Sequence, residues 1–117
     1  MQLGVMGALF GGMKLDEALD YCQKIGLDAI ELPAGGCPGD PWGLNGITKK
    51  KTKLKELKAK VADRGLSVQG IAVHGNPVHP DKRQAKADHQ AFRNAVLLAA
   101  EFKTVVITFS GCPGGGP

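Results

Sequence analysis

The sequence has few aromatic residues, few cysteines and no long apolar run. Aromatic residues make up 5% of the 117 positions, and the three cysteines, Cys22, Cys37 and Cys112, contain no CxxC pair. An odd number of cysteines without paired spacing argues against a disulfide framework and favours a reducing compartment. No apolar stretch approaches the ~20 residues of a membrane span, and the N-terminus lacks the pattern of a signal peptide. We therefore expect a cytoplasmic protein with no membrane partner.

Two nucleotide-binding motifs are also missing. The first glycine-rich segment, residues 7–12, lacks the G-x-G-x-x-G spacing, and no GxxxxGK[ST] sequence occurs. The net charge of +4 comes mainly from the lysine-rich segment 49–60. A basic run can bind nucleic acid, but Leu54, Leu57 and Val61 fall on one helical stripe and no aromatic residue is interleaved with the lysines. We interpret the segment as a solvated helix face, with Glu56 and Lys60 paired at i,i+4.

Two hydrophobic periods alternate along the chain. Short apolar runs predict strands at residues 3–7, 28–32, 67–74 and 104–109, with Pro33 stopping the second. Periodic apolar residues predict helices from Leu15 to about Ile25, from about residue 49 to 64, and from about 85 to 102. The buried face expected for the third helix consists of Phe92, Ala95, Val96, Ala99 and Phe102.

This βα alternation predicts a parallel sheet with right-handed crossovers. A doubly wound open sheet and an arc of a (β/α) barrel both fit the pattern, and the missing dinucleotide motif weakens the first. The fold class is therefore α/β: a partial TIM barrel of three βα units plus a fourth parallel strand. In the arc, the strands lie in the order 1-2-3-4 with helices on one face only.

Candidate site residues follow the strands, where both architectures place their sites. Glu31 lies at the end of an apolar strand, where a carboxylate is costly unless it is paired or exposed in a site. His74 ends the third strand, and a neutral imidazole there can bind a metal or a sugar hydroxyl. His79 lies in the following loop and His89 on the third helix. The non-functional alternatives are that the Glu31 carboxylate is simply solvated and that His74 is held by a backbone carbonyl.

A short repeat follows two of the strands. Gly-Cys-Pro-Gly occurs at residues 36–39 and again at 111–114. A zinc site built from Cys37, Cys112 and His74 would lack both a zinc motif and a fourth ligand. We interpret the tetrapeptides as turns whose backbone N–H groups face a ligand.

Three segments resemble one enzyme family. They are residues 72–81 (AVHGNPVHPD), 107–114 (ITFSGCPG) and the opening pair 15–19 and 25–32 (LDEAL and IGLDAIEL). Together they resemble the sugar phosphate isomerase/epimerase family of the xylose-isomerase-like TIM barrel superfamily. The resemblance covers essentially the whole chain, and residues 1–117 are expected to form the N-terminal portion of one barrel domain.

The resemblance implies metal-assisted proton transfer on a ketose, an aldose or a sugar phosphate, with Mn, Mg, Co or Zn as the divalent metal. Metal ligands in this family come chiefly from strands five to eight. No tightly bound metal is therefore expected in this chain. The substrate-binding residues carried over by the resemblance are Glu31, His74, Asn76, His79, Ser110 and Cys112.

Three functional hypotheses follow. The first is a sugar isomerase or epimerase domain, here incomplete and inactive alone, that needs self-association or the missing barrel half. The second is a non-catalytic half-barrel that pairs with itself or with another chain. The third is a relative of the apurinic endonucleases, which share the superfamily's barrel, although nucleic acid is not the expected partner.

Overall fold

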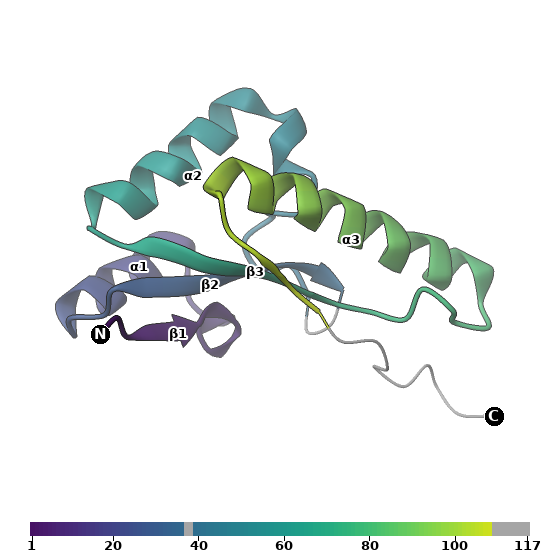
Figure 1. The fold of residues 1–117 in the computed structure, drawn as a ribbon, viewed down its shortest axis with the longest axis horizontal. Coiled ribbons are helices and arrows are strands. Elements are labelled where there is room, and N and C mark those ends of the chain that lie inside the picture. The colour runs from purple at the N-terminus through teal and green to yellow at the C-terminus, as the bar shows by residue number, and fades with distance from the viewer. Residues whose placement is uncertain (37–38, 109–117) are drawn as a thin grey trace.

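The protein, seen in a computed structural model, is described for residues 1–36 and 39–108 and forms one sheet with helices packed against it (Figure 1). The sheet contains four parallel strands in the order β1-β2-β3-β4. This order confirms the predicted barrel arc. The elements run in chain order as β1 (Gly4–Met6), η1 (Gly7–Phe10), α1 (Leu15–Lys24), β2 (Ala29–Gly36), η2 (Ile47–Lys49), α2 (Lys51–Asp63), β3 (Ser67–His74), α3 (Lys82–Phe102) and β4 (Val106–Ile107).

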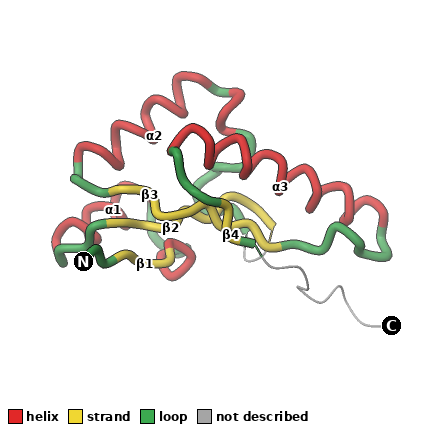
Figure 2. The backbone as a smooth tube through the Cα atoms, viewed as in Figure 1, coloured by secondary structure: helices red, strands yellow, loops and turns green. Residues whose placement is uncertain are grey.

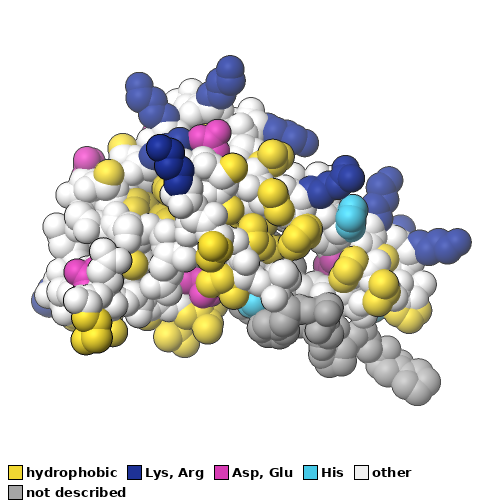
Figure 3. All heavy atoms as spheres, in the orientation of Figure 1, with side chains coloured by type: hydrophobic (Ala, Val, Ile, Leu, Met, Phe, Trp, Pro, Cys, Tyr) yellow, Lys and Arg dark blue, Asp and Glu magenta, His cyan; other side chains and the backbone are white. Residues whose placement is uncertain are grey.

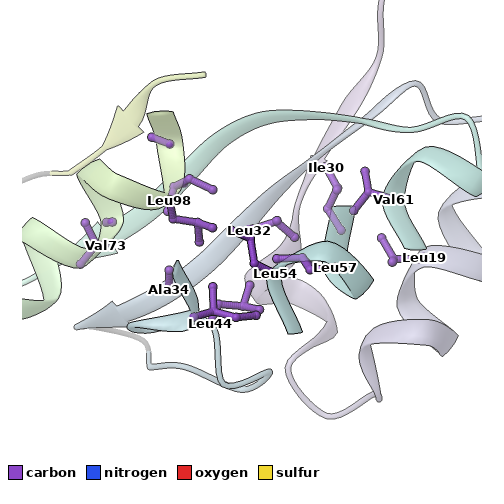
Figure 4. Close-up of a cluster of buried hydrophobic side chains, with 14 of the residues drawn as sticks. Leu19, Ile30, Leu32, Ala34, Leu44, Leu54, Leu57, Val61, Val73 and Leu98 are labelled. Carbon is purple, nitrogen blue, oxygen red and sulfur yellow. The ribbon is translucent and has the colours of Figure 1, made fainter. Parts of the chain in front are cut away.

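The helices cover one face of the sheet, as predicted. Ile30, Leu32 and Ala34 alternate along β2 and belong to one buried cluster with Ile71 and Val73 of β3. All three helices contribute to the same cluster, so they share this face, and Figure 2 shows α2 and α3 lying over the strands. Figure 4 shows the helix and strand side chains of this cluster meeting: Leu19, Leu54, Leu57, Val61 and Leu98 from helices, with Ile30, Leu32, Ala34 and Val73 from strands.

The connections that precede strands are short because each helix ends in a left-handed residue. Gly26 after α1 and Gly65 after α2 have φ values of 81° and 68°, which glycine adopts without a Cβ penalty. Lys103 performs the same role after α3 with φ 52°. At the other end of α3, the Asp81 carboxylate accepts a hydrogen bond from the Arg83 N–H. This N-cap starts the helix at Lys82, a few residues before its predicted start.

The basic residues of α2 join it to neighbouring helices. Lys60 donates to Asp16 of α1 at 2.8 Å, Arg64 contacts Asp16 and Asp20, and Lys58 pairs with Glu101 of α3 at 2.6 Å. The predicted Glu56–Lys60 pair is wrong, because Lys60 reaches across to α1 instead. These pairs support the interpretation of the lysine-rich segment as an ordinary helix face.

Strand β2 is longer than predicted. It continues through Pro33 to Gly36, where the sequence analysis ended it before the proline. The reason is that β1 is short: Met6, its last residue, pairs with Glu31, so beyond this point β2 is bonded only to β3. A proline is tolerated where one side of a strand carries no ladder.

The buried face of α3 is rotated from the predicted one. Ala91, Ala95, Leu98 and Ala99 are buried, whereas Phe92 and Val96 are 40% and 44% exposed. The prediction holds for Ala95, Ala99 and Phe102, which are buried or packed against the core, and is wrong for Phe92 and Val96. The neighbouring stripe with Leu98 is also apolar, and only packing against the sheet chooses between the two. Figure 3 shows hydrophobic side chains gathered on the surface around α3 and β4.

Within residues 1–36 and 39–108, no helix is both long and apolar enough to cross a bilayer.

Candidate functional site at the ends of the strands

Glu31 is the buried charged residue of the described chain, with 7% of its surface exposed. It lies between Ile30 and Leu32, whose side chains enter the core, so its own side chain points to the face without helices. In a closed barrel this face becomes the interior. Burial raises the pKa of the Glu31 carboxyl, and the positive charge of His74 opposes that rise.

His74 shares this face at the end of β3. The strand register aligns Glu31 with Gly70, and His74 follows Gly70 by four residues, an even step that keeps the same face. His74 is partly exposed and lies near enough for its charge to act on Glu31. Glu31, within β2, and His74, at the end of β3, therefore lie on the same face of the sheet.

A glycine brings the end of β2 against the His74 backbone. Gly36 pairs with His74 in the sheet and has φ 68°. A Cβ at this position would lie 1.8 Å from the His74 carbonyl oxygen, so no other residue fits. The backbone around the histidine is thus fixed by two neighbouring strands.

The loop after β3 uses its polar groups internally. The Asn76 backbone N–H donates to Asp88 Oδ2 at 2.9 Å, and the Asn76 side-chain oxygen accepts from the Val78 N–H at 3.2 Å. His79 Nδ1 accepts from the Asp81 N–H at 2.9 Å. In the neutral ring this leaves the proton on Nε2. Asn76 and His79 therefore shape the loop beside His74.

Asp88 of α3 was not identified from the sequence. Its two carboxylate oxygens accept from Asn76 and from Gln84, and it packs against Gly75, where a Cβ would lie 3.0 Å from the Asp88 side chain. The sequence shows only an acid in the first half of a long helix, and the partial burial of Asp88 is visible only in the structure. Such a residue is recognised only when the opposing loop is in place.

A cavity of about 330 Å³ opens beyond Glu31. Its walls come from the loop after β1, the end of β2 and the loop after β2: Ala8, Gly11, Pro33, Gly39, Asp40 and Pro41. Pro33 lies two residues after Glu31 on the same strand face, which makes the cavity continuous with that face. The Asp40 carboxylate accepts from the N–H groups of Leu44 and Asn45 and so holds the wall in place.

A larger cavity of about 520 Å³ has a different position. It lies between the end of β4, the loop after β3 and α3, and Val73 in its wall points to the helix-covered side of β3. It is therefore outside the face that carries Glu31 and His74. Its lining is Val73, Gly75, Pro77, Asp88, His89, Phe92 and Thr108.

The described residues do not include the other cysteine and serine positions singled out in the sequence. Ser110, Cys112 and Cys37 lie outside the described residues. Cys22 is buried in the core, where burial raises its thiol pKa and keeps the sulfur protonated. Within the described parts of the chain, no three His, Cys, Asp or Glu side chains group together as a metal site would require. Glu31 and His74 alone do not make a metal cage.

A sequence profile described as "Xylose isomerase-like TIM barrel" matches residues 19–117. The chain belongs to this family. The match agrees with the parallel arc of strands. Members of this family generally depend on a metal, but the described residues show no metal site.

Two individual proteins are similar to the chain. The uncharacterised protein YfiH of Bacillus subtilis (strain 168) is 26% identical over 120 residues, covering all of this chain and 38% of that protein. The crystal structure of the probable 3-DHS dehydratase AsbF, involved in petrobactin synthesis in Bacillus anthracis, superposes with a TM-score of 0.64 at 19% identity. The chain is covered to 95% and AsbF to 39%. The chain thus spans about two fifths of the length of both.

Proposed function

We propose that this chain supplies one wall of the substrate pocket of a sugar isomerase or epimerase. The observation that carries the proposal is Glu31, a carboxylate buried on the helix-free face of the sheet near His74. Burying a carboxylate there lowers stability unless it is paired, and ionisable groups kept in such positions cluster at functional sites. Membership of the xylose isomerase-like family supports a sugar or sugar phosphate as the ligand.

In this proposal, Glu31 and His74 bind hydroxyl groups. A sugar hydroxyl donates to the Glu31 carboxylate, and the His74 ring donates to or accepts from a second oxygen. The raised pKa makes the Glu31 carboxylate a better proton acceptor than a solvated one, which suits it to proton transfer next to a carbonyl. The cavity beyond Pro33 holds the rest of the ligand. Asn76, His79, Ser110 and Cys112 complete the predicted substrate-binding set, with Asn76 and His79 acting through the loop that they shape.

The test is ligand binding by the purified chain. Amide and side-chain NMR signals are followed while ketoses, aldoses and their phosphates are added at millimolar concentration. Shifts confined to the ends of β2 and β3 are expected. Glu31→Gln and His74→Ala should each weaken the response at least tenfold, whereas Glu56→Gln, an exposed glutamate on α2, should leave it unchanged. Equal binding by all three variants, or no shift near Glu31 with any sugar, would refute the proposed pocket.

A further inference from the structure

Trp42 contacts both ends of the loop that follows β1. Its indole Nε1 donates to the carbonyl oxygen of Met13, at the end of this loop, at 3.0 Å. Its ring lies against Gly7 at the start of the loop, since a Cβ built on Gly7 would be 3.2 Å from Trp42 Cζ3. The same loop carries Ala8 and Gly11, which form one wall of the 330 Å³ cavity. Trp42 therefore touches this wall at both of its ends.

Trp42 also belongs to the opposite wall of the cavity. Its neighbour in the chain, Pro41, lines the cavity together with Asp40. The Asp40 carboxylate fixes this turn by accepting hydrogen bonds from the backbone N–H groups of Leu44 and Asn45. A turn with internal hydrogen bonds thus carries Trp42, and one side chain joins the two walls.

The start of the first wall is fixed by β2 itself. A Cβ on Gly7 would lie 2.3 Å from the Glu31 carbonyl oxygen and 3.0 Å from Pro33 Cδ, so the backbone at Gly7 is in close contact with this strand. The end of the loop at Met13 has no such support from β2 and is instead bonded to Trp42. The distance between the two walls therefore depends on the Trp42 hydrogen bond.

The hydrogen bond matters because the indole ring is not enclosed on every side. Trp42 is partly buried and lines a second cavity of about 160 Å³, together with Leu15 and Leu57. A ring with free space beside it is held by its directional contact more than by close packing. Without the indole N–H, the ring can move into this space, and the loop at 7–13 is no longer tied to the turn at 40–45.

We propose that Trp42 is a positioning residue that sets the width of the 330 Å³ cavity and thereby favours shorter over longer sugars. Trp42 touches no reacting atom and acts through the two loops. The identity of the ligand rests on the proposed function, whereas the link between the walls exists without any ligand. A pocket with walls at a fixed distance discriminates between ligands that differ by one carbon unit by about tenfold or more.

The experiment uses the full 117-residue chain and two variants. Trp42→Phe removes the N–H donor and keeps an aromatic ring. Tyr21→Leu is the matched control, because Tyr21 contacts Phe10 of the same loop, with 5.9 Å between ring centroids, but lies on α1 and lines neither wall. Circular dichroism establishes that both variants keep the helix content of the wild type.

Hydrogen exchange tests the link between the walls without a ligand. The chain has one tryptophan, so its indole N–H gives a single NMR signal, which should exchange more slowly than that of a free tryptophan side chain. In Trp42→Phe, the backbone amides of Met13 and Leu44 should exchange about tenfold faster, the effect of losing one hydrogen bond. The Ile71 amide, bonded within the sheet, should be unchanged. A freely exchanging indole proton, or no change at Met13 and Leu44, would overturn the inference, as would the same change in Tyr21→Leu.

Sugar titrations followed by NMR test the consequence for the ligand. With tetroses, pentoses and hexoses, Trp42→Phe should shift the ratio of affinities toward the longer sugars by about tenfold, and Tyr21→Leu should not change it. An equal loss of affinity for every sugar would mean that Trp42 only stabilises the fold, which contradicts the inference. If the wild type binds no sugar, the proposed function fails, whereas the exchange result still decides whether Trp42 sets the width of the cavity.

Discussion

The ionisation of Glu31 is a source of instability within the fold. Burial raises its native pKa above the unfolded value of about 4.3. A carboxyl with a raised native pKa favours the folded state below the unfolded pKa, and this contribution is lost as the pH rises through the native pKa. We expect Glu31→Gln to become more stable relative to wild type as the pH increases from about 3.5 to about 7.5.

Urea unfolding of both proteins across this pH range measures the difference. Glu56→Gln, which replaces an exposed glutamate of α2, serves as the control. If Glu31→Gln instead loses stability relative to wild type as the pH rises, the carboxylate is stabilised by its surroundings and the native pKa of Glu31 is lowered, not raised.

Substitution of Gly36 measures how closely the backbone of β2 approaches His74. A Gly26→Ala change places a side chain at φ 81° in open space and should cost about 1 kcal/mol, the strain of the left-handed region alone. Gly36→Ala has a comparable φ of 68° but would also drive a methyl group into the His74 carbonyl oxygen. Its cost should exceed that of Gly26→Ala by about 1–3 kcal/mol. Chemical unfolding of the pair gives this difference, and equal costs would mean that the two strands separate easily.

At the scale of the element, α3 presents two apolar stripes and buries only one. Leu98 is 1% exposed in the core, whereas its neighbour Leu97 is 52% exposed. Leu98→Ala should lower the free energy of unfolding by about 2–5 kcal/mol through lost burial and the remaining cavity. Leu97→Ala should change it by no more than about 0.5 kcal/mol. Unfolding curves of the two variants decide which stripe faces the sheet, and a reversed order would mean that α3 is rotated.

At the scale of the whole molecule, the proposed hydroxyl-binding pair consists of two titratable side chains within the described residues. Glu31 and His74 share a face, and no third ligand joins them within the described parts of the chain. We expect the purified chain by itself to show no turnover above background with ketoses, aldoses or their phosphates in the presence of manganese, cobalt or magnesium. A polarising metal contributes several kcal/mol of transition-state stabilisation, and each ~4 kcal/mol corresponds to roughly a thousandfold in rate.

Product formation followed by chromatography, with and without added metal, provides the measurement. An active xylose isomerase-like enzyme assayed in parallel confirms that the substrates and metals are competent. Metal-dependent turnover that Glu31→Gln abolishes would show that this chain carries a complete catalytic centre.

The sequence alone determined the features that arise from nearby residues. The alternation of apolar periods predicted the four strands and three α-helices of the described residues, and this alternation together with the missing nucleotide motif predicted the order of the strands in the sheet. Glu31 and His74 were proposed as site residues because each was expected at the end of an apolar strand; His74 does end β3, whereas Glu31 lies inside β2, which continues to Gly36. These inferences need only local spacing and the handedness of the crossover.

Only the tertiary structure decided the features that depend on distant partners. Strand β2 passes Pro33 because β1 ends at Met6, and neither segment carries that information by itself. Lys60 pairs with Asp16, 44 residues away, although a glutamate lies four residues from it on the same helix. The two apolar stripes of α3 are equivalent in the sequence, and the sheet buries one of them because a helix can face a neighbouring layer with only one side.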